Sequence, residues 1–249
     1  MKSSSIYTLD QLNRLDKALI PKHVAIIPDG NRRWAKQLKE NPEKGHYRGA
    51  NALIEIVKAA KEIGIKTVTF YGFSTENWSR SEEEINILMW LIKEFLSDHC
   101  EEMQKTGVRF HTIGNLAPLP KEVLNAIEKT CRTTAHCDTI NMVIALNYGA
   151  RNEIQRVLQK IIEDCQNGKV QKEHITEALI SSYMDTAAWG DPDLFIRTSG
   201  EKRISNYLLW QLAYTEIYFT NVLWPDFKPA NLLEAIEDFQ KRERRWGGA

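Results

Sequence analysis

The stretch His23-Val24-Ala25-Ile26-Ile27-Pro28-Asp29-Gly30-Asn31-Arg32-Arg33-Trp34 decides the fold that the sequence predicts. Its apolar run, residues 24–27, reads as a short strand buried on both faces, and Gly30 allows a sharp turn into a helix. Asp29 then lies at the carboxyl end of the strand, where open α/β sheets bind their ligands. Free N–H groups at the start of a helix suit phosphate, and a carboxylate beside them can hold Mg²⁺. The stretch therefore predicts a diphosphate site, and a turn with a salt bridge is the alternative.

Apolar, β-branched runs alternate with helical patterns along the rest of the chain, which is typical of a mainly parallel sheet flanked by helices. The expected strands are 23–28, 66–73, 107–113, 140–146, 193–197 and about 216–220. The expected helices lie near 31–39, 46–63, 82–105, 120–135, 150–166, 174–187, 206–213 and 229–243. No long linker or internal repeat interrupts the pattern. We expect a single α/β domain over residues 21–249 with a sheet of about six strands, and residues 1–20 as an arm or a short amphipathic helix.

The composition excludes several classes of protein. The 249 residues include 33 basic and 33 acidic side chains, and the resulting formal charge of zero argues against a nucleic-acid partner. The four cysteines contain no C-x-x-C pair, so we expect neither a disulfide framework nor a zinc site. No stretch resembles a signal peptide or a membrane span. The reducing cytoplasm is the expected compartment.

A second polar segment follows the expected strand 66–73, again at the carboxyl end of the strand. It combines hydroxyl, carboxylate, amide, indole and guanidinium groups: Ser74, Thr75, Glu76, Asn77, Trp78 and Arg80. Because the carboxyl ends of parallel strands meet at one edge of the sheet, these groups add a second wall to the site of Asp29. Each of them alone also suits a loop or a helix cap.

A third segment, residues 193–206, places Arg197 at the end of a buried strand, with Arg203 and Ser205 soon after a glycine turn. Guanidinium groups bind phosphate oxygens in pairs, and a serine hydroxyl can complete the set. We therefore expect phosphate binding here. Ion pairs of both arginines with Glu201 or other acids are the structural alternative.

Glu216 stands in a strongly aromatic stretch, residues 214–227. A carboxylate in apolar surroundings is costly unless it is paired or bound to a metal. Since Mg²⁺ usually takes only one or two protein carboxylates beside substrate phosphates, Glu216 is a candidate metal ligand. Pairing with a nearby arginine is the alternative.

The helical pattern that begins at Glu82 carries a wide apolar stripe. Its members are Ile85, Leu88, Met89, Ile92, Phe95 and Leu96. Periodicity alone fits both a packed core and the wall of an apolar tunnel, and both interpretations stay open.

Together these segments resemble the cis-prenyltransferase family, and within it the bacterial undecaprenyl diphosphate synthases. The matching stretches follow in order over nearly the whole chain: His23–Lys36, Gly45–His46, Phe73–Arg80, Asn147–Gly149, Asp193–Asp226 and Arg242–Gly248. Motifs of other classes are missing from the sequence, namely G-x-x-x-x-G-K-[ST], G-x-G-x-x-G, G-x-S-x-G and the Asp-Asp-x-x-Asp of trans-type prenyl synthases.

The resemblance implies a homodimer that performs a Mg²⁺-dependent condensation of isopentenyl diphosphate with an allylic diphosphate, usually farnesyl diphosphate. The implied product is a long polyprenyl diphosphate, by default undecaprenyl diphosphate, the precursor of the lipid carrier for cell-wall glycan synthesis. A hydrophobic tunnel would accept the chain, with Gly72, Leu88, Ile140 and Leu146 as candidate wall positions. Peripheral contact with the inner face of the membrane would release the product.

The resemblance also implies roles for individual residues. Asp29 would hold Mg²⁺ and help to ionise the allylic diphosphate, Asn77 would accept the proton, directly or through water, and Glu216 would complete the metal site. The expected contacts of the allylic diphosphate and its pocket are Gly30, Asn31, Arg32, Arg33, Trp34, His46 and Trp78, with Ser74, Thr75, Glu76 and Arg80 around Asn77. The expected isopentenyl diphosphate site is Arg197, Arg203, Ile204 and Ser205.

The sequence departs from the family pattern at a few positions. Pro42 stands where an arginine is common, so that Lys39 or Lys44 is a candidate replacement. Pro28 replaces methionine and Lys202 replaces histidine. Two rival functions remain: a non-catalytic partner subunit of the same fold, against which Asp29 and the segment 245–247 argue, and a Mg²⁺-dependent phosphohydrolase.

Overall fold

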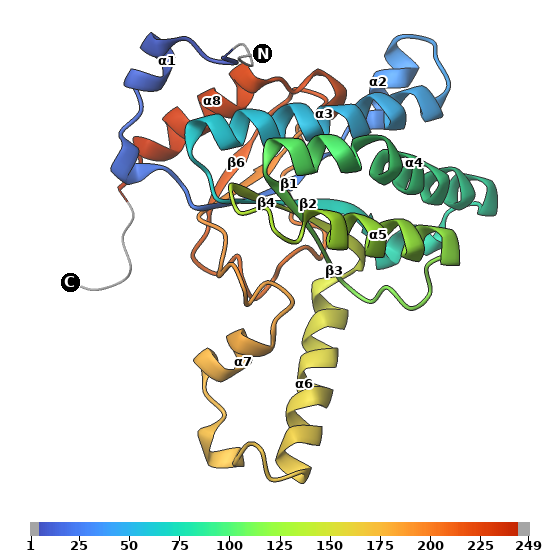
Figure 1. Ribbon diagram of the computed structural model, residues 1–249, viewed down its shortest axis with the longest axis vertical. Helices are drawn as coiled ribbons and strands as arrows, with labels where there is room; N and C mark the ends of the chain where they lie inside the picture. Colours follow the sequence, from blue (N-terminus) through green and yellow to red (C-terminus); the bar gives the residue numbers. More distant parts are fainter. Residues whose placement is uncertain (1–4, 244–249) are drawn as a thin grey trace.

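The computed structural model describes residues 5–243, and six strands of this part form one sheet. They are β1 (His23–Ile27), β2 (Thr67–Ser74), β3 (Val108–Ile113), β4 (Ile140–Tyr148), β5 (Leu194–Arg197) and β6 (Glu216–Phe219). Every neighbouring pair is parallel, in the order β3-β4-β2-β1-β5-β6. The predicted single-domain α/β fold around a parallel sheet of about six strands is confirmed (Figure 1).

The helices of the described residues are α1 (Leu9–Asn13), α2 (Asn31–Gln37), α3 (Pro42–Ile63), α4 (Glu82–Thr106), α5 (Lys121–Thr134), α6 (Ala150–Gln166), α7 (Glu177–Tyr183) and α8 (Pro229–Gln240). Short 3₁₀ turns join them, among them η2 (Thr75–Ser79) and η4 (Trp224–Asp226). α3 begins earlier than the pattern predicts because Pro42 suits a first helical turn. α6 and α7 extend away from the sheet (Figure 1).

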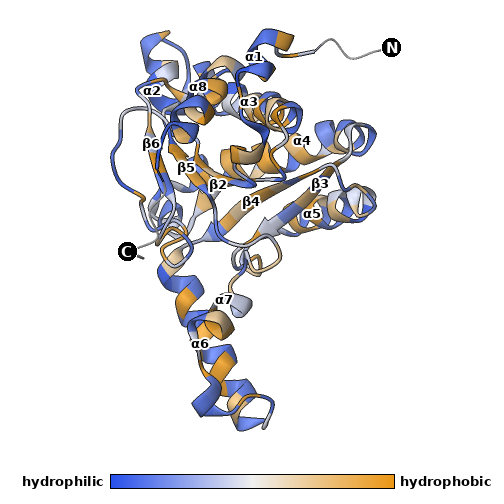
Figure 2. Ribbon diagram, turned by 90° about the vertical axis from the view of Figure 1, so that its left-hand side faces the viewer, coloured by the Kyte–Doolittle hydropathy of each residue, from blue (hydrophilic) through white to orange (hydrophobic). Residues whose placement is uncertain are grey.

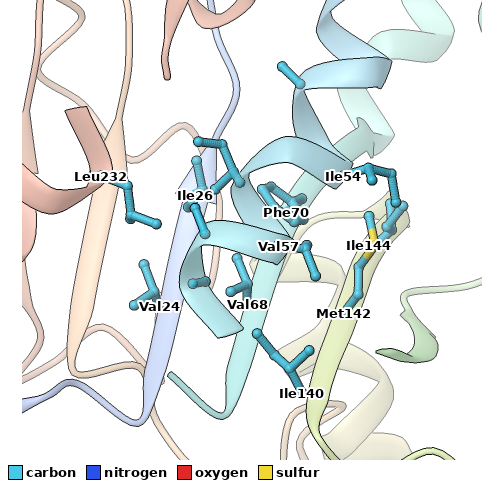
Figure 3. Packing of buried hydrophobic residues seen from close by; sticks show 14 of the residues in the cluster. Val24, Ile26, Ile54, Val57, Val68, Phe70, Ile140, Met142, Ile144 and Leu232 are labelled. Atoms are coloured by element: carbon cyan, nitrogen blue, oxygen red, sulfur yellow. The ribbon is translucent and has the colours of Figure 1, made fainter. Parts of the chain in front are cut away.

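One face of the sheet packs against α3, α4, α5 and α8 through a continuous apolar core. Val24, Ile26, Val68 and Phe70 point from β1 and β2 toward α3, as Figure 3 shows. Figure 2 shows the strands as the most apolar layer of the molecule. Because side chains alternate between the two faces of a strand, all five residues of β1 are buried only if the other face is covered too.

The second face is covered by a folded segment without helix, residues 204–214, and the predicted helix over 206–213 is wrong. Ser205, Asn206 and Leu208 have positive φ angles of 48°, 61° and 49°, which a right-handed helix does not permit. Tyr207 and Leu208 are nevertheless fully buried against the sheet. The apolar residues in this segment have a helix-like spacing, but they lie on successive non-helical turns.

Residues 5–20 pack on the ends of α3 and α8, with α1 as a short helix in between. The Glu62 carboxylate accepts hydrogen bonds from the backbone N–H groups of Ile6 (2.9 Å) and Tyr7 (3.0 Å). The Tyr7 hydroxyl donates to the Pro229 carbonyl at 2.9 Å, and the side chain is buried. Between residues 5 and 243, no helix combines the length and the apolar character that a bilayer crossing requires. The segment 245–247 lies outside the described residues.

We expect His23 to make the fold sensitive to acid. Its Nδ1 donates to the Gly190 carbonyl (2.9 Å) and its Nε2 accepts from the Thr69 hydroxyl (2.7 Å), so the buried ring is satisfied when neutral. Burial lowers the pKa of His23 to about 4. The unfolded chain, with a histidine pKa near ~6.5, takes up the proton first, so the free energy of unfolding falls between pH 6.5 and 4, by roughly 3 kcal/mol for this group.

Urea unfolding at pH 7 and pH 4.5 measures the effect, with His23→Gln as the non-titrating control. The difference in the free energy of unfolding between wild type and His23→Gln should change by a large part of those roughly 3 kcal/mol between the two pH values. A difference independent of pH would contradict this account of His23.

Candidate active site

A cavity of about 740 Å³ opens at the carboxyl ends of β1, β2 and β5. Twelve of the residues that the sequence predicts line it: Asp29, Gly30, Asn31, Arg32, Arg33, His46, Ser74, Glu76, Asn77, Arg80, Arg197 and Ser205. The segments that carry them are far apart in the sequence and meet because parallel strands end at the same edge. β2 lies next to β1 on one side, and β5 lies next to β1 on the other side, followed by β6. The cavity therefore lies where the strand order reverses.

Asp29 and Arg197 form the central ion pair of the cavity. Ile27 is level with Arg197 in the sheet, and the turn after β1 brings Asp29 Oδ2 to 2.8 Å from Arg197 Nη2. Arg197 also donates through Nη1 to Ser205 Oγ at 2.7 Å, and its side chain is only 4% exposed. Burial alone would raise the pKa of Asp29, but the hydrogen bond and charge of Arg197, together with Arg33, hold it below its usual value. Asp29 is therefore ionised at neutral pH.

Three further arginines surround this pair, and each already has a carboxylate partner. Arg33 lies 3.5 Å from Asp29 and 3.3 Å from Glu201. Arg32 and Arg80 share Glu84, at 3.6 Å and 2.8 Å. Four guanidinium groups thus face a cavity lined by only two carboxylates, Asp29 and Glu76, and the excess of positive charge favours a polyvalent anion.

Glu76 and Asn77 form the wall that follows β2. The backbone N–H of Ser74 donates to Asn77 Oδ1 at 3.0 Å and fixes the amide in the η2 turn. Glu76 accepts a hydrogen bond from Asn206 Nδ2 at 2.7 Å. Burial would raise the pKa of Glu76, but Asn206 and other hydrogen-bond donors lower it. Both carboxylates of the cavity are therefore anions.

Two buried polar atoms at the inner end of the cavity have no hydrogen-bond partner among the described residues, Asn31 Oδ1 and His46 Nε2. Burial, together with the positive charge of Arg80, lowers the pKa of His46 to about 4, so the ring is neutral. Asn31 is fixed by the close approach of α3, because a Cβ on Gly49 would lie only 2.3 Å from its Oδ1. Since buried polar groups rarely remain unpaired, both atoms mark a place for a ligand group or a water.

An apolar cavity of about 110 Å³ adjoins this inner end, between α3, α4, β2 and β4. The two cavities share the residues Pro28, Asn31, His46, Gly72 and Leu88. The remaining wall consists mainly of apolar side chains: Ala50, Leu53, Leu91, Ile92, Phe95, Ile144, Leu146 and Trp224, beside Gly49. Part of the apolar stripe of α4 therefore belongs to the core, and Leu88, Ile92 and Phe95 line this cavity. Ile140, at the start of β4, is buried in the core and is not one of the lining residues.

Two predicted tryptophans lie outside the cavity. Trp34 Nε1 donates to Asp226 Oδ1 at 2.9 Å, and Trp78 Nε1 donates to Asn147 Oδ1 at 2.8 Å. Trp78 and Thr75 line a neighbouring surface depression. The two indoles therefore tie α2 to η4 and the η2 turn to the end of β4.

Arg203 and Ile204 do not line the cavity either. The Arg203 side chain is 61% exposed and pairs with Glu201, whereas its carbonyl accepts from Arg197 Nη1 at 2.5 Å. Ile204 packs on the second core. Of the predicted basic replacements for position 42, Lys44 pairs with Glu40 at 2.7 Å.

The structure does not bring Glu216 to Asp29. Glu216 begins β6 level with Leu194 and Val24, five positions before Asp29 and two strands away. Glu216 is not one of the residues that line the cavity of Asp29. Glu216 instead accepts from Arg242 Nη1 at 2.8 Å. A metal site that combines Asp29 and Glu216 therefore stays a prediction.

Two polar cavity residues were not among the predicted site residues, Tyr71 and Asn206. The Tyr71 ring stacks on Tyr207 at a centroid distance of 4.4 Å, and its hydroxyl donates to the Tyr148 carbonyl. Its position at the carboxyl end of a predicted strand was an available signal. Asn206 directly follows Ser205, but the positive φ angles that turn it inward leave no mark in the sequence.

Asp29 is the carboxylate that fits a bound Mg²⁺, because it is ionised, half-buried and part of the cavity wall. Mg²⁺ commonly binds one or two protein carboxylates and completes its shell with phosphate oxygens and water. Among residues 5–243 no three His, Cys, Asp or Glu side chains gather as a ready-made metal cluster. The residues therefore fit an ion shared between Asp29 and an anionic ligand.

Comparisons with known proteins agree with this geometry. A family described as putative undecaprenyl diphosphate synthase matches residues 27–247. The chain is 45% identical over 241 residues to an isoprenyl transferase of Chlamydia muridarum, covering 95% of either protein. It is 46% identical over 229 residues to an isoprenyl transferase of Geobacillus kaustophilus, covering 92% of this chain and 89% of that protein.

Two solved structures are similar along nearly the whole chain. Lavandulyl diphosphate synthase from Lavandula x intermedia, crystallised with dimethylallyl diphosphate, has a TM-score of 0.90 at 34% identity and covers 93% of this chain and 100% of that chain. A probable undecaprenyl diphosphate synthase from Campylobacter jejuni has a TM-score of 0.77 at 32% identity and covers 92% of this chain and 99% of that one.

Proposed function

The chain belongs to the undecaprenyl diphosphate synthase family of cis-prenyltransferases, and on that premise we propose which reaction it performs. It condenses isopentenyl diphosphate units onto an allylic diphosphate, farnesyl diphosphate by resemblance. The product is a long polyprenyl diphosphate, and undecaprenyl diphosphate is the expected length.

The junction of a cationic cavity with an apolar one carries the proposal. The ligand that fits both is an amphiphile with a polyanionic head and an aliphatic tail. Four arginines suit the diphosphate, and the side chains of Leu53, Ile92 and Phe95 suit the tail. The similar lavandulyl diphosphate synthase was crystallised with a ligand of this class, dimethylallyl diphosphate.

The allylic diphosphate is placed beside Asp29, with Arg33, Asn31 and His46 around it. Asp29 would hold a bound Mg²⁺, which would supply charge neutralisation for the leaving diphosphate. Arg33 adds a fixed positive charge to the same group, which stabilises the developing anion. Neutral His46 can donate or accept a hydrogen bond there without adding charge.

The isopentenyl diphosphate is placed beside Arg197 and Ser205, whose contact at 2.7 Å preorganises the two groups. Asn77 lines the same cavity, with its Oδ1 fixed by the Ser74 N–H. A neutral amide is a very weak base, so Asn77 orients the proton-accepting group, a water or a phosphate oxygen, rather than keeping the proton itself. The apolar cavity keeps water away from the allylic carbon, which gains carbocation character as the diphosphate leaves.

Purified protein incubated with labelled isopentenyl diphosphate, farnesyl diphosphate and Mg²⁺, followed by product sizing, tests the proposal. A long polyprenyl diphosphate that disappears with chelator is the expected result. Released phosphate without elongation would mean a phosphohydrolase. No reaction by folded protein would mean a non-catalytic subunit.

We expect Leu88→Trp to shorten the products, because Leu88 lies where the polar and apolar cavities meet. The larger tryptophan side chain narrows the path of the growing prenyl chain, and repacking around it costs about 1–3 kcal/mol of stability. Product sizing by chromatography measures the effect, with Leu9→Trp at the exposed surface of α1 as the control of equal size change. Unchanged product lengths in Leu88→Trp would mean that the growing prenyl chain does not pass Leu88.

The protein is proposed to work as a homodimer in the cytoplasm, with peripheral contact at the inner face of the membrane where its product enters the lipid phase. Leu158 and Ile162 of α6 are 51% and 56% exposed, and β6 is an edge strand, which supports self-association. The product would supply the lipid carrier for cell-wall glycan synthesis. Sedimentation of the purified protein measures the oligomeric state.

A further inference from the structure

Asn206 lies where three segments of the cavity wall meet. Its Nδ2 donates to Glu76 Oε1 in the η2 turn at 2.7 Å, and its Oδ1 accepts from the backbone N–H of Arg151 in α6 at 3.0 Å. Its own carbonyl accepts from the Ala150 N–H at 2.8 Å. One side chain on the turn after β5 thus joins the start of α6 to a carboxylate of the cavity.

The orientation of the Asn206 amide is set by these partners. A backbone N–H can only donate, so the amide oxygen must face Arg151, and the NH₂ group must then face Glu76. The space is also closed, because a Cβ on Gly149 would lie 2.8 Å from Asn206 Nδ2 and 2.5 Å from Thr75 Oγ1. The amide therefore presents a fixed donor to Glu76.

Glu76 needs such a donor because of where it lies. Glu76, Arg197 and Ser205 line the same cavity, and Ser205 is the neighbour of Asn206 in the chain. The Glu76 carboxylate is an anion in the same cavity as the buried Arg197 guanidinium, and loss of the hydrogen bond from Asn206 would leave it freer to turn toward that positive charge. A carboxylate there would occupy the place of a phosphate group.

We propose that Asn206 is a positioning residue that holds the Glu76 carboxylate away from Arg197 and Ser205, and so keeps this subsite open for the diphosphate of the substrate. The proposal rests on the proposed function for the identity of that substrate. The hydrogen bond from Asn206 to Glu76 and the shared cavity rest on the geometry alone.

A double-mutant cycle of Asn206→Asp and Glu76→Gln tests it. Asn206→Asp keeps an oxygen for the Arg151 N–H, but it replaces the donor toward Glu76 by a second carboxylate. We expect the KM for isopentenyl diphosphate to rise about tenfold, with kcat changed much less. In the Glu76→Gln background, where the new amide can donate to the carboxylate, the same substitution should change KM by less than about twofold.

Equal increases of KM in both backgrounds would overturn the proposal, because Asn206 would then act only through the start of α6. Thermal unfolding of each variant reports on that structural contribution. If Asn206→Asp does not fold, Asn206→Gly removes the same donor at a position whose φ of 61° suits glycine, and it should raise KM in the same way.

Calorimetric binding of inorganic pyrophosphate separates this proposal from the proposed function. Weaker binding by Asn206→Asp, restored in the double variant, supports the role of Asn206 even if the wild type does not elongate prenyl chains. Equal pyrophosphate binding by all four proteins contradicts it even if the wild type elongates them.

Discussion

Asp29→Asn should lower kcat/KM for condensation by roughly a thousandfold while the protein remains folded. In the wild-type protein, Arg197 Nη2 lies 2.8 Å from Asp29 Oδ2. The asparagine keeps an oxygen at this place, so the buried guanidinium retains an acceptor. The amide cannot hold Mg²⁺ as a carboxylate does, and the departing diphosphate loses its neutralisation. Steady-state kinetics with farnesyl and isopentenyl diphosphates, together with a Mg²⁺ titration, measure the loss.

Asp98→Asn, an exposed position on α4, is the matched control and should keep wild-type activity. Circular dichroism and thermal unfolding establish that Asp29→Asn is folded. Full activity of Asp29→Asn with unaltered dependence on Mg²⁺ would be incompatible with the assigned site.

Arg197→Lys should raise the KM for isopentenyl diphosphate by about a hundredfold, although the charge is conserved. The guanidinium reaches Asp29, Ser205 and the Arg203 carbonyl at the same time, with contacts of 2.8, 2.7 and 2.5 Å. A single ammonium group cannot satisfy this divergent set. Because the side chain is 4% exposed, the unmatched partners also cost stability, about 1–3 kcal/mol.

Arg132→Lys provides the control for this substitution, since that arginine is 74% exposed on α5. Kinetics and denaturant unfolding of both variants are compared. A lysine at position 197 that supports near wild-type KM would show that the position contributes charge alone.

The central strands β1, β4 and β5 were predictable because they are buried on both faces and therefore read as mostly apolar runs. The carboxyl-end rule then placed Asp29, Asn77 and Arg197 at one cavity. The segment 206–213 could not be predicted, because positive φ angles at Ser205, Asn206 and Leu208 replace a helical pattern by turns.

Side-chain direction and register limit what the sequence predicts about the site. Arg203 and Ser205 are two residues apart, yet only Ser205 lines the cavity. The indole of Trp34 is directed by Asp226, and that partner lies 192 positions later. Glu216 joins Asp29 only through the family resemblance, and the register places it at the start of the edge strand β6, level with Leu194.

The carboxylate partners of the four cavity arginines have a consequence for turnover. An incoming diphosphate does not meet bare cations but exchanges with Glu84, Glu201 and Asp29, so its affinity is the difference between two sets of ion pairs. Such a difference is smaller than the full attraction of four arginines. In the proposed reaction, the carboxylates would return to the arginines when pyrophosphate leaves, and this return would lower the barrier to release. A site that expels pyrophosphate after each added unit, as we propose for this one, benefits from holding its own competing anions.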